Sequence, residues 1–177
     1  MSIDPNQLQI VWYPAPVLSR KASPIESVTD PVRAVATRML ELMHEAQGVG
    51  LAGPQVGLPW RLFVANPTGE PEDDRVYINP VLSEGSREVE DLEEGCLSLP
   101  EIRGVVRRNK AITIDALSLD GERVQRRAED LEARIWQHET DHLDGILILS
   151  RMRHLDRMAN RRAVKQLEQA MPPARRR

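Results

Sequence analysis

With 177 residues, 41% of them hydrophobic and 29% charged, the chain has the balance of a soluble protein, and we expect one domain over residues 1–177. Its net charge of −3 is too small to indicate a polyanionic partner for the whole surface. The single cysteine excludes an intrachain disulfide, the start lacks a secretory signal, and no apolar run approaches the ~18 residues of a membrane span, so a cytoplasmic protein is expected.

The first third of the chain predicts an arm, a helix and a loop. Residues 10–18 are apolar but interrupted by two prolines, so an extended arm is expected rather than a helix. Residues 29–31, Thr-Asp-Pro, suit a helix start, and apolar residues at helical spacing follow up to a stop near Gly48. The stretch 48–57 holds four glycines and a proline, which argues against a helix or a regular strand and predicts a loop.

The middle of the chain predicts mainly strands. These are expected over residues 61–65, 75–82, 110–117 and 122–128, the last two joined by an Asp-Gly hairpin turn. The acidic segment 83–94 between them is expected to be a solvated surface. A helix should then carry residues 131–142, followed by a short buried stretch at 146–149 and a final helix from Leu155 to about Ala170. The expected fold class is α+β: mostly antiparallel strands around a central helix, with further helices near both ends.

The central helix contains the motif H-E-x-x-H at residues 138–142. Positions four apart share a helix face, so His138 and His142 can present their rings to one metal ion. Glu139 follows the first histidine, where its carboxylate can reach a water at the metal without binding the metal. A bare motif of this kind also arises by chance, and Ile148 occupies the position of a metzincin's third histidine. Either the third ligand lies upstream or there is no metal site.

Cys96 is the upstream residue that answers this question. A thiolate with two imidazoles gives a Cys-His-His set that leaves one position open for water, the pattern of a catalytic metal site. A cysteine considered alone is more simply a small buried apolar residue. Its setting, between Gly95 and a segment that ends in Pro100, weakens that interpretation.

Three motifs taken together resemble those of the peptide deformylase family. Residues 48–55 (GVGLAGPQ) resemble its first motif, 94–98 (EGCLS) match its second and 137–142 (QHETDH) its third, in the family's order and spacing. The arm at residues 13–18 is similar as well, and the resemblance covers roughly residues 8–150. One difference is Gly53, where the family usually has alanine. The missing methyl group is expected to loosen the loop without removing a catalytic group.

The resemblance implies a metal-dependent hydrolase that removes the formyl group from N-formyl-methionyl peptides and releases formate. Cys96, His138 and His142 would bind one divalent metal ion per chain, Fe2+ in the cell, with Zn2+, Ni2+ or Co2+ able to replace it. Glu139 would transfer the proton during catalysis. The chain is expected to act as a monomer.

The resemblance also implies an oxyanion hole, formed by Gln55 and the backbone N–H of Leu97. Residues that resemble the groove for the peptide main chain are Val49, Gly50, Gly95 and Arg103. For the first substrate side chain the helical spacing indicates a pocket, with Leu131 and Ile135 before the two histidines on the same face and Leu92 approaching through the Cys96 segment.

Two other functions are compatible with parts of the sequence. A zinc endopeptidase shares H-E-x-x-H, but its usual third ligand is missing here. A metal-stabilised binding module descended from a deformylase would need neither Glu139 nor Gln55, and both are present.

The C-terminal part of the chain is basic. Residues 150–177 have a net charge of +7, which leaves −10 for the rest of a chain whose total is −3. The nine basic residues are Arg151, Arg153, Arg157, Arg161, Arg162, Lys165, Arg175, Arg176 and Arg177. Either the final helix docks on the body by an apolar stripe with its basic residues solvated, or it binds ribosomal RNA, a role implied by deformylases with a C-terminal helix.

Overall fold

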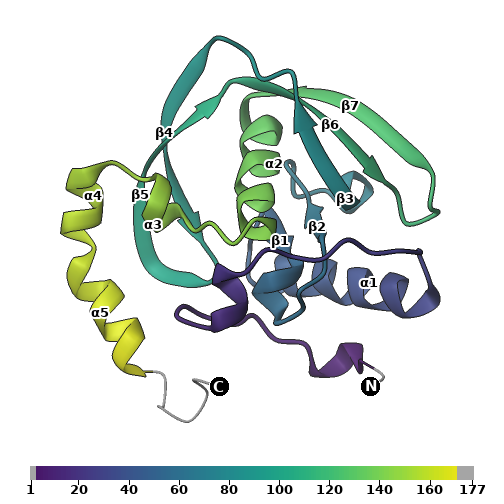
Figure 1. Cartoon of the computed structure of the whole chain (residues 1–177), viewed down its shortest axis with the longest axis horizontal. Coiled ribbons are helices and arrows are strands. Elements are labelled where there is room, and N and C mark those ends of the chain that lie inside the picture. The colour runs from purple at the N-terminus through teal and green to yellow at the C-terminus, as the bar shows by residue number, and fades with distance from the viewer. Residues whose placement is uncertain (1–2, 171–177) are drawn as a thin grey trace.

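The computed structural model describes residues 3–170 and confirms the α+β class (Figure 1). An antiparallel five-stranded sheet has the order β1-β2-β3-β6-β7, and β4 pairs with β5 in a separate antiparallel hairpin. The strands are β1 (Gly50–Ala52), β2 (Leu62–Ala65), β3 (Arg75–Ser83), β4 (Val89–Cys96), β5 (Leu99–Asn109), β6 (Ala111–Leu117) and β7 (Arg123–Glu129).

Helices occur at both ends of the described chain and in its centre. The α-helices are α1 (Asp30–Glu45), α2 (Asp130–Leu143), α3 (Ile148–Arg151), α4 (His154–Ala159) and α5 (Arg161–Ala170), and short 3-10 turns include η2 (Pro16–Ser19) and η3 (Gly53–Val56). Among the helices of residues 3–170, none is both long and apolar enough to cross a membrane.

Helix α2 occupies the centre of the molecule, against strands of both sheets (Figure 1). Its core-facing side includes Ala133, Trp136 and Leu143, which are fully buried against Phe63 and Tyr77 of the larger sheet. Because strands surround the helix, even polar residues near its end are held at low exposure. The structure thus places the H-E-x-x-H motif inside the protein rather than on a surface helix.

The glycine-rich segment is more regular than the sequence predicted. Gly50, Leu51 and Ala52 form β1, in register with residues 63–65 of β2, and the 3-10 turn η3 follows. The prediction that this stretch excludes a strand was wrong, because pairing with a neighbouring strand satisfies backbone groups whatever the side chains are. Only Gly48, Val49 and Gly57 of this stretch lie outside β1 and η3, and Gly57 has a φ of 81°, in the left-handed region.

At the position of Gly53 the structure has no room for the methyl group of an alanine. A Cβ built there would lie 2.5 Å from the backbone carbonyl oxygen of Trp60. The expectation that Gly53 loosens the loop is therefore not supported by the packing, because a neighbouring backbone segment occupies the space.

We predict that Gly53→Ala destabilises the protein by about 1–3 kcal/mol, the usual cost of overpacking a filled site. Urea denaturation of the parent and the variant measures the difference. An unchanged or increased free energy of unfolding would show that the segment at Trp60 moves aside without cost.

The acidic segment 83–94 is not simply a solvated surface, which corrects the sequence prediction. Residues 89–95 pair with residues 103–109 of β5, so that Glu90 faces Arg108 and Asp91 faces Arg107 across the two strands. The side chains of Asp91 and Arg107 form an ion pair at 3.0 Å, a kind of contact that stabilises neighbouring strands. Glu94 is 7% exposed.

The predicted final helix is two helices. It breaks at Asn160, whose side-chain amide donates to the backbone carbonyls of Arg103 and Asp156.

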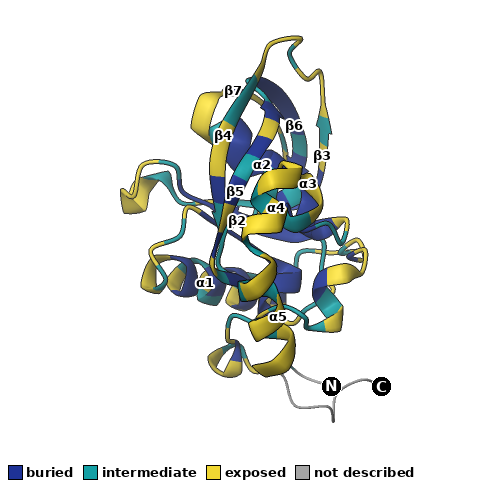
Figure 2. Cartoon of the chain, turned by 90° about the vertical axis from the view of Figure 1, so that its left-hand side faces the viewer, coloured by how far each residue is buried: buried dark blue, intermediate teal, exposed yellow. Residues whose placement is uncertain are grey.

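The stretch expected at 146–149 is partly helical, as α3. Ala163, Val164 and Leu167 of helix α5 pack against the cluster of buried side chains that includes residues of β5, α3 and Leu18 of the arm, which supports docking by an apolar stripe. Figure 2 shows the rest of α4 and α5 as largely exposed. Of the basic tail, residues 175–177 lie outside the described range.

Candidate active site

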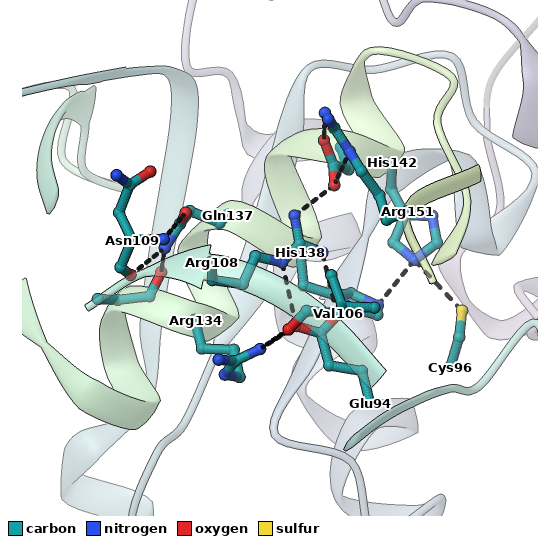
Figure 3. Close-up of polar contacts among 12 residues, drawn as sticks. Glu94, Cys96, Val106, Arg108, Asn109, Arg134, Gln137, His138, His142 and Arg151 are labelled. Atoms are coloured by element: carbon teal, nitrogen blue, oxygen red, sulfur yellow. Dashed lines mark hydrogen bonds and ion pairs between the residues drawn. The ribbon is translucent and has the colours of Figure 1, made fainter. Parts of the chain in front are cut away.

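Cys96, His138 and His142 converge on one point although the cysteine lies 42 positions before the first histidine in the sequence (Figure 3). Cys96 ends β4, and the two histidines lie one turn apart on α2. The distance from Cys96 Sγ to His142 Nε2 is 3.3 Å, and that between the two histidine Nε2 atoms is 3.2 Å. All three potential ligand atoms lie within 4.8 Å of one another.

This geometry fits a metal ion. Tetrahedral coordination with metal–nitrogen bonds of about 2.0 Å and metal–sulfur bonds of about 2.3 Å places the ligand atoms roughly 3.3–3.6 Å apart. Two imidazole nitrogens and a sulfur facing one another at these separations match that arrangement. With three protein ligands, the fourth position stays available for water or substrate.

Glu94 fixes the orientation of His138. Its Oε2 lies 3.0 Å from His138 Nδ1, so the imidazole donates this hydrogen bond and directs its other nitrogen, Nε2, toward Cys96 and His142. Burial raises the pKa of Glu94, but hydrogen bonds from His138 and Arg108 outweigh it and hold the pKa well below its usual range. Glu94 therefore remains a carboxylate and an acceptor.

Two buried arginines hold Glu94 in turn. Arg108 donates from Nε and Nη2 to the two carboxylate oxygens, each at 3.0 Å, and Arg134 Nη1 donates to Oε1 at 2.7 Å. None of these three residues was assigned to the site from the sequence. Glu94 does belong to the second motif, but the acidic composition around it indicated a surface, and its arginine partners come from β5 and α2.

Glu139 is 4% exposed, and its Oε2 has no hydrogen-bond partner within residues 3–170. Burial raises the pKa of Glu139 to about 7, although His138 opposes the increase. A carboxyl group with a pKa near neutrality can both accept and return a proton. Gly50 passes so close that a Cβ there would lie 2.4 Å from Glu139 Oε1. A larger residue at this position would displace the Glu139 carboxyl group, so the glycine allows β1 to approach it closely.

Gln55 is held with its amide N–H groups toward the cysteine. Its Oε1 accepts a hydrogen bond from the backbone N–H of Ala52 at 2.8 Å, and its Nε2 lies 3.3 Å from Ser98 Oγ and 3.5 Å from Cys96 Sγ. The N-terminal arm ties the two segments together, since Val11 donates to the Gln55 carbonyl and Tyr13 to the Ser98 carbonyl. Leu97 lies between Cys96 and Ser98 in the turn that joins β4 to β5.

A groove of about 1140 Å³ runs along these residues. Its lining includes predicted site residues Val49, Gly50, Gln55, Gly95, Cys96, Leu97, Arg103, Leu131, Ile135, His138 and Glu139. It also includes Ile10 and Trp12 of the arm, which no sequence pattern had indicated as site residues. His142 lies behind the lining at 1% exposure.

The predicted side-chain pocket is only partly assembled by the structure. Ile135 is buried beside the histidines, whereas Leu131, in the first turn of α2, is 49% exposed at the groove. Leu92 is 46% exposed and does not belong to the groove lining. Cys96 lies four positions further along the extended strand, a distance of roughly 13 Å, which explains why adjacency in the sequence did not bring Leu92 to the groove.

Three candidate ligands around an open position, with a buried carboxyl group beside them in a groove, define the kind of site found in metal-dependent hydrolases. The family model for polypeptide deformylase matches residues 7–158, and the chain belongs to this family of hydrolases.

Individual relatives agree with this assignment. The chain is 42% identical over 164 residues to a peptide deformylase of Acidobacterium capsulatum, a match that covers 91% of this chain and 95% of the relative. It is 40% identical to a peptide deformylase of Caulobacter vibrioides, over 86% of this chain and 88% of the relative. A crystal structure of peptide deformylase from Plasmodium falciparum superposes with a TM-score of 0.88 at 34% identity, covering 91% of this chain and 95% of that one.

Proposed function

We propose that this protein is a metal-dependent deformylase that hydrolyses the N-formyl group of N-formyl-methionyl peptides, with Cys96, His138 and His142 as the metal ligands. The observation that carries the proposal is the meeting of three ligand atoms within 4.8 Å at a groove that also contains Glu139. The family assignment supports the reaction, and the donor set supports the metal.

A divalent cation at this position would supply Lewis acidity, which lets water attack at neutral pH and polarises the formyl oxygen. Glu139 takes a proton from the attacking water as the oxygen–carbon bond forms. The same carboxyl group then delivers a proton to the leaving nitrogen as the carbon–nitrogen bond breaks, so the products are formate and a free amine. The buried position of Glu139 and its raised pKa support both transfers.

Gln55 and the backbone N–H of Leu97 stabilise the negative charge that develops on the formyl oxygen. The amide of Gln55 is preorganised by Ala52 and Ser98, so little reorganisation is needed during the reaction. One such donor is typically worth about 10²–10³ in rate.

The groove holds the peptide main chain along Val49, Gly50, Gly95 and Arg103, and places the first side chain near Ile135 and Leu131. The physical basis is a lining that combines backbone and guanidinium groups with apolar side chains. An apolar site of this kind suits the flexible thioether of methionine.

We expect N-formyl-Met peptides to exceed N-formyl-Ala peptides in kcat/KM by about 10-fold or more, the lower end for a large apolar side chain. Steady-state formate release from two peptides that differ only in this residue measures the ratio. Equal values would mean that no side-chain pocket forms beside Ile135.

The reaction itself is tested with three blocked peptides of one sequence, carrying N-formyl, N-acetyl or N-succinyl groups. Formate from the first peptide alone is the expected result. Cleavage of internal bonds in the acetylated peptide would instead indicate a zinc endopeptidase, and metal binding with no turnover would indicate a binding module.

The proposed metal in the cell is Fe2+, with Zn2+, Ni2+ or Co2+ able to substitute. Cys96 is half-buried in the groove rather than sealed in the core, so its thiolate is accessible to oxidants. A ferrous thiolate site is therefore expected to lose activity in air or peroxide.

We also propose that residues 1–177 act as one cytoplasmic, monomeric domain that binds ribosomes through its C-terminal helices. Arg157, Arg161, Arg162 and Lys165 are all exposed on α4 and α5, which supports contact with RNA phosphates. Because α5 packs on the body of the protein by its apolar side, these exposed basic side chains can face a partner.

Exchange of these four residues for glutamine is predicted to reduce co-sedimentation with bacterial ribosomes at low salt, while activity on short formyl peptides stays unchanged. Binding of the parent should also fall steeply as salt rises. Equal co-sedimentation of the parent and the variant would contradict ribosome binding through these residues and would mean that the basic side chains are only solvated.

A further inference from the structure

The segment after α2 packs against β4 and β5, the two strands that lead to and from Cys96 and its turn. The chain turns at Gly145, where a Cβ would lie 2.9–3.0 Å from the backbone of Ser19 and Arg20, and then forms α3. Ile148 and Met152 of this segment are buried in the cluster that includes residues of β5. This packing fixes the position of Arg151, which lies between the two anchors.

Arg151 binds Asp141, the residue next to His142. Its Nη2 donates to Asp141 Oδ1 at 2.6 Å and its Nε to Oδ2 at 3.1 Å, a two-pronged contact. The side chain of Asp141 is 12% exposed, whereas that of Arg151 is 45% exposed. A polar cavity of about 270 Å³ borders both residues and also Arg108.

From Asp141 an unbroken series of hydrogen-bonded ion pairs leads to His138 (Figure 3). Arg108 Nη1 donates to Asp141 Oδ2 at 2.5 Å, while its Nε and Nη2 bind Glu94. Glu94 in turn accepts the hydrogen bond from His138 Nδ1. Arg108 is thus shared between two buried carboxylates, of which only Glu94 contacts the histidine.

Because Arg108 binds both carboxylates, a change in the partners of Asp141 also affects how Arg108 holds Glu94. With Arg151 present, Asp141 has a second cation and needs only one nitrogen of Arg108. Without Arg151, Asp141 is a buried carboxylate with Arg108 as its remaining side-chain partner within the described residues, and it draws the guanidinium away from Glu94. A buried charge that loses one partner attracts the other more strongly.

We propose that Arg151 is a positioning residue for the metal site, acting through Asp141, Arg108 and Glu94 on the ring of His138. The inference rests on the proposed function, since it assumes that His138 binds metal. It makes the short helix α3 part of the support of the site. It also distinguishes Arg151 from Arg153, Arg157, Arg161 and Arg162, the other described arginines that follow it, which are exposed and lie outside this series of ion pairs.

The test compares Arg151→Gln with Arg153→Gln. Arg153 is two residues further along and forms an exposed ion pair with Asp91 at 2.6 Å, so it controls for loss of one positive charge from the same segment. Arg151→Gln is expected to fold, because the cavity beside Asp141 admits water as a partial substitute. The readouts are the Kd for Zn2+, by competition with a chromogenic chelator, and the thiolate and d–d absorption bands of the Co2+-loaded protein.

We expect Arg151→Gln to weaken Zn2+ binding by about 10-fold, the lower end for residues that orient a metal-bound histidine, and to shift the Co2+ bands. Arg153→Gln should stay within about 2-fold of the parent, the scale of an exposed pair. Arg151→Lys, which keeps the charge but not the fork, should recover part of the loss. Combining Arg151→Gln with Asp141→Asn should add little to Asp141→Asn alone, because both act through one series.

Unchanged Kd and Co2+ bands in Arg151→Gln would overturn the proposal, as would equal losses in the Arg151 and Arg153 variants. A lower melting temperature with a normal Kd would show that Arg151 is only a structural residue, which also overturns it. Absence of metal binding by the parent would instead refute the proposed function, so the two failures are distinguishable.

Discussion

Cys96→Ser is expected to lose most of the bound metal and to reduce formate release by more than about 100-fold, because a site with three protein ligands has none to spare. The Sγ atom lies 3.3 Å from His142 Nε2, so its replacement by the harder and less acidic hydroxyl oxygen directly changes the donor set. His138→Ala and His142→Ala should have similar effects. Metal analysis by mass spectrometry and a coupled formate assay measure both losses.

Leu155→Ala provides a matched control, since Leu155 is 79% exposed on α4 and lies outside the groove. It should retain the metal content and turnover of the parent. A Cys96→Ser protein with normal metal content and near-normal turnover would contradict the assignment of the cysteine as a ligand.

Glu139→Gln is expected to keep the metal and to lower kcat by at least about 10², the usual scale for loss of a general base. Glutamine preserves the size of the side chain beside Gly50 but cannot accept the proton. Because the carboxyl group lies beside the three ligands without belonging to the cluster that they form, metal content should remain that of the parent. A variant that keeps its metal but loses its turnover would distinguish Glu139 from the three ligands, whose variants should lose both.

Both quantities are measured on the same preparation, with metal content per chain and single-turnover formate release. If Glu139→Gln lost the metal together with the activity, the residue would have to be assigned to metal binding. If it kept near-normal turnover, another group would have to move the proton.

Periodicity and turn signals in the sequence predicted the helices at residues 30–45 and 130–143 and four strands of the larger sheet, β2, β3, β6 and β7, to within a few residues, whereas the strand β1 was expected to be a loop. These elements are determined by local patterns: a capped start, helical spacing or alternation around a hairpin. The hairpin of β4 and β5 was not predicted, because β4 is stabilised by charges on its partner strand rather than by its own pattern. The break at Asn160 likewise depends on a contact with the carbonyl of Arg103.

The three candidate ligands and Glu139 were selected from motif spacing and lie together in the structure. Their supporting residues were not predicted, since Glu94, Arg108 and Arg134 meet only after β4, β5 and α2 have packed. Leu92 illustrates the opposite case, in which nearness along the chain did not place a side chain in the groove. Local patterns thus identify reactive residue types, whereas the network that orients them is a property of tertiary packing.

The most direct test of the account is anaerobic purification followed by metal analysis and a formate-release assay on the same sample. We predict about one divalent ion per chain, with Fe2+ before exposure to air, and formate release from an N-formyl-Met peptide that is lost on chelation and restored by adding Fe2+, Ni2+ or Co2+. Formate release that is unaffected by complete removal of the metal, or a fully loaded protein that releases no formate, would contradict the account.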